Sequence, residues 1–214
     1  MSLRLSRISN CILIHVGDLG IGFYHPEKQK SHLSHLNDFL LEKNIQMLVC
    51  RGNHDDPAFF KDSHPINGEH SNIRLVEDYT YLTINGKSFL FVGGAISIDR
   101  AYPHRIEGRT YWKDEPFRLH DDYPNLPKCD VLITHSAPSG LFPCDGMANI
   151  QGFFEDDPNL KGELVSERCN IRLVFDAVQP KAIAYGHFHK SNFEVVDGCK
   201  VKCLNINEIW ELTI

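Results

Sequence analysis

The sequence lacks the features of a secreted or membrane-anchored protein. Its seven cysteines are an odd number and form no Cys-x-x-Cys pair, a usage that favours free thiols in a reducing, cytoplasmic compartment over a disulfide framework. The first apolar run covers only Cys11–Val16, which is too short for a signal peptide, and no run approaches the ~20 residues of a membrane-spanning helix. We therefore expect a cytoplasmic chain without a membrane partner.

Positive charge is also scarce. Lys and Arg total 22 against 28 Asp and Glu, which gives a formal net charge of −6 without any basic cluster. Because binding to duplex nucleic acid depends on clustered positive charge, we expect no duplex partner. The acidic balance does not exclude a nucleotide or a short single strand held at a metal. Nothing in the sequence sets the oligomeric state.

The length and composition are those of an ordinary globular chain. The 214 residues are 42% hydrophobic and 23% charged, and a chain of this size buries roughly 70% of its unfolded surface. Since we find no internal repeat, low-complexity tract or linker, the sequence predicts a single domain over residues 1–214.

The pattern of apolar runs predicts an α/β fold. Cys11–Val16 indicates a buried strand, a helix begins at Pro26 and ends at Lys43-Asn44, and Ile45–Cys50 indicates a second strand. This β-loop-α-β order favours parallel pairing, with functional residues at the carboxyl ends of the strands. Residues 99–128 form a loop of a length that is uncommon unless it is functional. The remaining predicted elements are strands at Ile73–Val76, Tyr79–Ile84, Ser88–Val92, Val131–Thr134, Ala182–Tyr185, Phe193–Val196 and Val201–Ile206, and a helix at Gly162–Val178.

Metal-type ligands follow four of these predicted strands. Twelve histidines are the one compositional oddity, and several of them stand directly after an apolar run. Imidazole, carboxylate and Asn oxygen together suit divalent Mn, Fe, Zn or Ni better than a site that prefers thiolates. The ligand-type residues at strand ends are Asp18, the run Asn53-His54-Asp55, His135, and the pair His187 and His189.

Taken together, these motifs resemble those of the calcineurin-like metallophosphoesterases. They are G-D at 17–18, G-N-H-D at 52–55, T-H-S-A-P at 134–138 and G-H-F-H at 186–189, in the family order. The resemblance implies a four-layer α/β/β/α sandwich of two mixed sheets with metals at one edge. It also implies hydrolysis of phosphomonoesters or phosphodiesters by two metals that share a hydroxide. Mn²⁺ is the expected ion, with Fe, Zn, Ni and Mg as alternatives.

The resemblance also assigns roles to individual residues. Asp18 would bridge the two metals, Asn53, His135 and His187 would complete one site, and His189 would bind the other ion. His54 would stand beside the leaving group as general acid or transition-state stabiliser, with Asp55 holding its ring.

Two residues beside these motifs, Arg51 and His15, also carry predictions. Arg51, directly before G-N-H-D, would either grip a substrate phosphate or form a surface salt bridge. His15, inside the first strand, reads as a core histidine with its hydrogen bonds satisfied.

The sequence departs from the family pattern near its start. Only sixteen residues precede Gly17, and none of them forms the first family motif, Asp-x-His. The chain therefore has one well-formed metal site, while the second retains only Asp18 and His189, fewer than the three protein ligands typical of open catalytic sites. Ile21 also replaces the second Asp of the family's G-D-x-x-D, which disfavours a protein phosphatase.

Three explanations of this departure stay open. The chain is a truncated form of an active enzyme, a one-metal enzyme of low activity, or a catalytically silent relative that uses the fold as a binding module. We expect a metal-dependent phosphoesterase, N-terminally short of the first family strand, with the truncated or silent binding module as the alternative.

Overall fold

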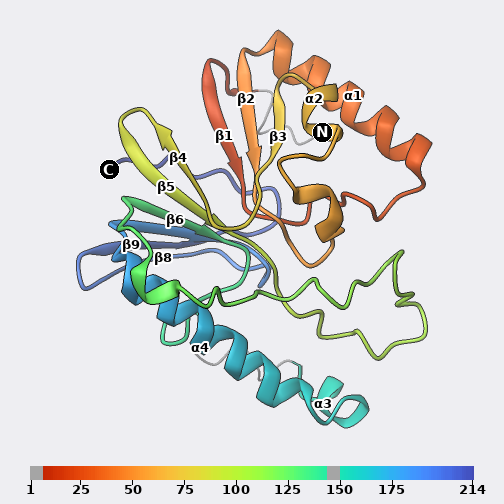
Figure 1. Ribbon diagram of the computed structural model, residues 1–214, viewed down its shortest axis with the longest axis vertical. Helices are drawn as coiled ribbons and strands as arrows, with labels where there is room; N and C mark the ends of the chain where they lie inside the picture. Colours follow the sequence, from red (N-terminus) through yellow and green to blue (C-terminus); the bar gives the residue numbers. More distant parts are fainter. Residues whose placement is uncertain (1–6, 144–149) are drawn as a thin grey trace.

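The structure, a computed structural model, describes residues 7–143 and 150–214. Two β-sheets lie face to face in it, with a long helix on the outer side of each (Figure 1). None of the helices in these two ranges is long and apolar enough to cross a membrane.

The first sheet comes from the N-terminal part of the chain. Strands β1 (Cys11–His15), β2 (Ile45–Val49) and β3 (Ile73–Leu75) are parallel, in the order β1-β2-β3. Helix α1 (Pro26–Glu42) connects the first two strands, with proline in its first turn, where the missing N–H costs nothing. Its apolar side, which includes Leu33 and Leu40, packs on the outer face of this sheet.

The second sheet is mixed and follows the order β4-β5-β6-β7-β9-β8. Its parallel centre, β5-β6-β7-β9, carries an antiparallel strand at each edge. Asn85-Gly86 and Asp197-Gly198 close the two hairpins with positive φ at both residues, as a two-residue hairpin turn requires. The bounds are β4 Thr80–Ile84, β5 Lys87–Val92, β6 Val131–Thr134, β7 Ala182–Tyr185, β8 Asn192–Val196 and β9 Cys199–Cys203.

The inner faces of the two sheets share one apolar core. Leu48 and Cys50 from the β2 region contact Phe91, Ile133 and Ala184 of the second sheet in this core. Fully burying one aliphatic or aromatic side chain of this size contributes about 1.5–3 kcal/mol. Helix α4 (Leu160–Val178) covers the outer face of the second sheet, so the layers run α1, first sheet, second sheet, α4 (Figure 1). The predicted four-layer α/β/β/α sandwich is confirmed.

Several short elements differ from the sequence prediction. The pattern missed the 3₁₀ turns Pro57–Phe60 and Tyr123–Asn125 and the one-turn helices α2 (Ile66–Glu69) and α3 (Phe153–Asp156), which are too short to show a periodicity. The last strand is β9 rather than Val201–Ile206, because the antiparallel pairing with β8 begins at Cys199 and ends at Cys203.

All six cysteines in the described residues are free thiols, as expected. Cys144 lies outside the described residues.

Candidate metal centre

The candidate ligands meet where the two sheets place the carboxyl ends of their parallel strands. Asp18 follows β1, Asn53 follows β2, His135 directly follows β6, and His187 follows β7. Glycines permit the close approach of these loops. A Cβ at Gly17 would collide with the His135 ring, and a Cβ at Gly52 would collide with the Asp18 carboxylate.

Three of the candidate residues have left-handed backbones. The φ angles are 63° at Asp18, 64° at His187 and 52° at His189. Residues other than glycine rarely adopt this conformation, and it costs roughly 1–2 kcal/mol each. The surrounding strands therefore impose an unfavourable conformation on residues that carry chemistry, as is frequent at functional sites.

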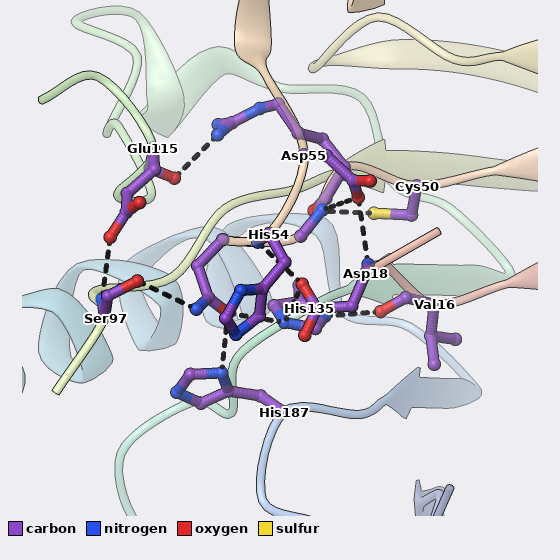
Figure 2. Close-up of polar contacts among 12 residues, drawn as sticks. Val16, Asp18, Cys50, His54, Asp55, Ser97, Glu115, His135 and His187 are labelled. Carbon is purple, nitrogen blue, oxygen red and sulfur yellow. Dashed lines mark hydrogen bonds and ion pairs between the residues drawn. The ribbon is translucent and has the colours of Figure 1, made fainter. Parts of the chain in front are cut away.

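The side-chain atoms converge on Asn53. Its Oδ1 lies 3.0 Å from His135 Nε2 and 3.0 Å from His187 Nδ1. His135 Nε2 is also 3.3 Å from Asp18 Oδ1, which accepts the His54 backbone N–H at 2.9 Å. Figure 2 shows His54, His135, His187 and Asp18 grouped in this way.

The hydrogen-bond partners around the group determine which atoms carry lone pairs. Asn53 Nδ2 donates to Ser97 Oγ at 3.0 Å, which leaves Oδ1 as the atom facing the histidines. His135 Nδ1 donates to the Val16 carbonyl at 2.6 Å, so Nε2 of the neutral ring carries a lone pair. That lone pair then faces two oxygens, Asn53 Oδ1 and Asp18 Oδ1. A cation held by these atoms would remove the repulsion.

The pKa directions keep a negative charge on Asp18 and a neutral ring at His187. Burial favours the neutral acid at Asp18, yet His135 and the His54 N–H lower the pKa of this carboxyl, which keeps it ionised. Burial works against a charged His135, but Asp18 raises its pKa above the ordinary value. For His187, burial lowers the pKa to about 3, so it offers a neutral ring nitrogen, the form in which imidazole binds metals.

The donor set fits one divalent ion. Within residues 7–143 and 150–214, His, Cys, Asp and Glu side chains alone form no group of three that could hold a metal. The centre thus depends on the Asn53 oxygen, which the other donors surround. His189 lines the same cleft, but in the described chain it makes no hydrogen bond or ion pair with those donors. Among residues 7–143 and 150–214, a second ion at His189 would therefore find no comparable donor set.

Asp55 differs from its expected role. The structure gives its carboxylate four backbone donors in place of the His54 ring: the N–H groups of Asp18, Gly20, Ile21 and Gly52, at 2.7–2.9 Å. It thereby ties the loop after β1 to the loop after β2. Burial raises the pKa of this carboxyl, and Asp18 adds to the rise.

Arg51 differs from both interpretations of it. Its side chain is 4% exposed, and it pairs with Asp78 through Nη2 at 2.8 Å and Nε at 3.1 Å. Nη1 donates to the Glu115 carbonyl at 2.6 Å. The guanidinium is thus a buried cross-link between the loop after β2 and the loop 99–128 rather than a surface salt bridge, and its N–H groups are directed at Asp78 and backbone carbonyls.

His15 also departs from expectation. Its Nδ1 is buried and has no hydrogen-bond partner in the described chain. Burial lowers the pKa of this ring, while Asp55 and Asp18 work in the opposite direction. The sequence showed no sign of this orphaned nitrogen, since the missing partner is visible only in three dimensions.

The sequence missed Arg105, which contacts His54. Arg105 Nη1 is 3.3 Å from His54 Nδ1, and the Phe23 ring stands edge-on to the imidazole at 5.4 Å between centroids. Burial lowers the pKa of His54. The positive charge of Arg105 lowers it further, while the negative charge of Asp18 works in the opposite direction. The signal in the sequence was the unusual length of the loop 99–128, which indicated a function without selecting a residue.

A cleft of about 360 Å³ opens beside the group. Its polar lining includes Asp18, Asn53, His187, His54 and Arg105. Apolar side chains form another part of its wall: Ile98, Ile150, Phe153, Leu164 and Phe188.

Comparisons with known proteins agree with this arrangement. A family model described as calcineurin-like phosphoesterase matches residues 5–191. One crystal structure superposes with a TM-score of 0.51 at 17% identity, covering 89% of this chain and 78% of its own. The crystal structure of a phosphopantetheinyl hydrolase from Mycobacterium tuberculosis gives 0.45 at 12% identity, covering 91% and 79%. The first likeness supports the fold alone, and the second is too weak to carry an argument. No curated protein matches significantly.

Proposed function

The chain belongs to the calcineurin-like phosphoesterase family, and on that premise we propose that it is a metal-dependent hydrolase of phosphomonoesters or phosphodiesters. The observation that carries the proposal is the convergence of Asp18, Asn53, His135 and His187 beside His54. Two neutral imidazoles, one carboxylate and one amide oxygen form a donor set suited to a divalent first-row ion.

These four residues would hold the ion, and Mn²⁺ is our proposal for it, with Fe, Zn, Ni or Mg as alternatives. Such an ion supplies Lewis-acid stabilisation of phosphoryl oxygens and lowers the pKa of a bound water. The chain itself fixes the donors: the Val16 carbonyl sets the His135 tautomer and Ser97 sets the Asn53 amide. Partners of this kind orient metal ligands and tune their basicity.

His54 is the residue proposed to assist the leaving group. Its backbone N–H is fixed on Asp18, and its ring lines the cleft between Phe23 and Arg105. Asp55 contributes by holding the loop that carries Asp18. Arg51 contributes by holding the loop that carries Asn53.

The proposed substrate is a small phosphate ester or a nucleotide. A cleft of about 360 Å³ has the size of a small-molecule site, and its apolar wall suits an organic group with little charge. The net charge of −6 argues against duplex nucleic acid. The free cysteines support a cytoplasmic location as part of the same proposal.

The test measures turnover and metal content on the same sample. The purified chain is supplied with Mn²⁺ and assayed on an aryl phosphodiester and an aryl phosphomonoester. We expect His54→Ala to abolish turnover while metal is retained, and His135→Ala to lose both. His32→Ala, on the exposed face of α1, is the matched control and should change neither.

Two outcomes would overturn the proposal. Full turnover in the His54→Ala protein would remove the assigned mechanism. Stoichiometric metal without turnover on either ester would favour the alternative, a catalytically silent binding module on the same fold.

A further inference from the structure

Arg105 is held rigidly against the ring of His54. Its Nε and Nη2 contact Asp99 Oδ1 at 2.9 and 2.7 Å, and its Nη1 donates to the Thr110 carbonyl at 2.8 Å. The Arg105 side chain is only 6% exposed. Local hydrogen bonds close the turn that carries it, because the Thr110 hydroxyl accepts from Ile106 N and donates to the His104 carbonyl.

The contact between the two side chains has one consistent polarity. A guanidinium has N–H donors only, so at 3.3 Å Arg105 Nη1 donates and His54 Nδ1 accepts. A neutral imidazole that accepts at Nδ1 carries its proton on Nε2. Arg105 therefore selects one of the two ring tautomers, in the way a partner at one nitrogen commonly fixes the other.

We propose that Arg105 is a positioning residue that fixes His54 in the Nε2–H tautomer, so that His54 presents a hydrogen-bond donor to the departing oxygen of the substrate. This inference rests on the function proposed above. Arg105 acts through His54 and is already bound on its other sides by Asp99 and Thr110. Arg105 thus lies outside the strand-end motifs and the candidate ligands, and its role is to control the proton position on His54.

The arrangement has a consequence for the substrate class. With Nδ1 occupied by the Arg105 N–H, His54 stabilises negative charge on the leaving oxygen through a hydrogen bond, and its Nε2 proton stays on the ring. Water attacks phosphorus and forms the new P–O bond while the bond to the leaving oxygen breaks, and the resulting oxyanion takes its proton from solvent water. The site is therefore best suited to phosphate esters whose leaving groups are stable as anions, such as aryl esters and phosphoanhydrides, rather than alkyl esters.

The first test is spectroscopic and needs no turnover. Long-range ¹H–¹⁵N correlation spectra of the metal-free and the Zn²⁺-loaded protein report which ring nitrogen of each histidine carries the proton. His54→Gln assigns the His54 signals by removing them. We expect the Nε2–H tautomer at His54 in the unmodified chain, and a mixture of tautomers in Arg105→Met. An Nδ1–H tautomer in the unmodified chain would overturn the inference, whether or not the variants fold.

The second test compares leaving groups in the Mn²⁺-loaded protein. In Arg105→Met we expect kcat to fall by about 10–100-fold, with little change in KM, and to fall further for phenyl than for 4-nitrophenyl esters. Arg105→Lys keeps the charge and a donor, and it should recover part of kcat. Arg109→Met removes a charge from the exposed part of the same segment and is the matched control.

The outcomes separate this inference from the proposed function. A rise in KM at unchanged kcat in Arg105→Met would overturn the positioning role, because it would show that Arg105 binds substrate directly. An Nε2–H tautomer in a protein that hydrolyses neither ester would support the Arg105 contact and overturn the phosphoesterase proposal. Turnover with an Nδ1–H tautomer would support the phosphoesterase proposal and overturn the positioning role of Arg105.

Discussion

Replacing Asp55 by Asn should destabilise the chain far more than the same change one residue later. The carboxylate accepts two backbone N–H groups on each oxygen, from Gly20 and Ile21 on Oδ1 and from Asp18 and Gly52 on Oδ2. In Asn one oxygen becomes an NH₂ group, which turns two of these bonds into donor–donor contacts. A hydrogen bond to a charged group contributes about 1.5–3 kcal/mol, so the expected loss is about 3–6 kcal/mol of unfolding free energy.

Asp56→Asn is the matched control. The Asp56 side chain caps the following 3₁₀ turn by accepting from Ala58 N at 2.9 Å, and Asn is an equally good capping residue. Urea unfolding followed by circular dichroism measures both variants. For a chain of this size, a loss of 3–6 kcal/mol lowers the melting temperature by about 6–24 °C.

A result within about 1 kcal/mol of the control would refute this reasoning. Hydrogen exchange on the unmodified chain provides a check that needs no variant. The amides of Gly20 and Ile21 lie in a loop, yet their bonds to Asp55 should protect them to nearly the level of the β2 strand.

Three further predictions concern metal binding, burial and pH. Asn53→Ala should abolish high-affinity Mn²⁺ binding in calorimetry, since its Oδ1 contacts two of the other donors; unchanged affinity would disprove the proposed centre. Arg51→Met should lower the unfolding free energy by about 3 kcal/mol, the lower end of the cost of breaking a buried ion pair, because the Asp78 side chain is 29% exposed; an unchanged unfolding free energy in chemical denaturation would contradict this. Burial raises the pKa of both Glu115 and Glu167 to about 7, so the folded chain binds more protons than the unfolded chain between about pH 4.5 and 7. Stability should therefore decrease as pH rises through that range, by up to about 3 kcal/mol for Glu167 alone, and Glu167→Gln should flatten the profile measured by thermal melts.

Elements with local chemical signals could be predicted from the sequence. Asn85-Gly86 closes a hairpin because both residues tolerate positive φ, and Pro26 begins α1 because proline fits a first helical turn. The candidate ligands could be found in the same way, since each follows an apolar strand of recognisable composition. In parallel strands the carboxyl ends share an edge, which brings such residues together without any knowledge of their side-chain contacts.

Contacts between distant segments could not be predicted. Arg51 and Asp78 are separated by 27 residues, and Arg105 and His54 by 51, and no local pattern shows that these side chains meet. The four hydrogen bonds of Asp55 could not be predicted for the same reason, because its partners lie in two loops that only the folded sheets bring together. Specific roles therefore depended on tertiary structure, whereas the candidate ligands were proposed from ligand-type residues at strand ends and from the motif resemblance, and their metal binding stays a prediction.

The left-handed backbones at Asp18, His187 and His189 have a consequence for engineering this chain. Glycine is the residue that fits such φ angles without strain. At Asp18 and His187 side-chain hydrogen bonds offset that strain, whereas His189 makes no such bond with the other donors in the described chain, so a screen that rewards only thermal tolerance will favour His189→Gly. That change would stabilise the fold and remove a ligand-type side chain from the cleft. A selection for stability in this protein should therefore also require metal binding or ester hydrolysis.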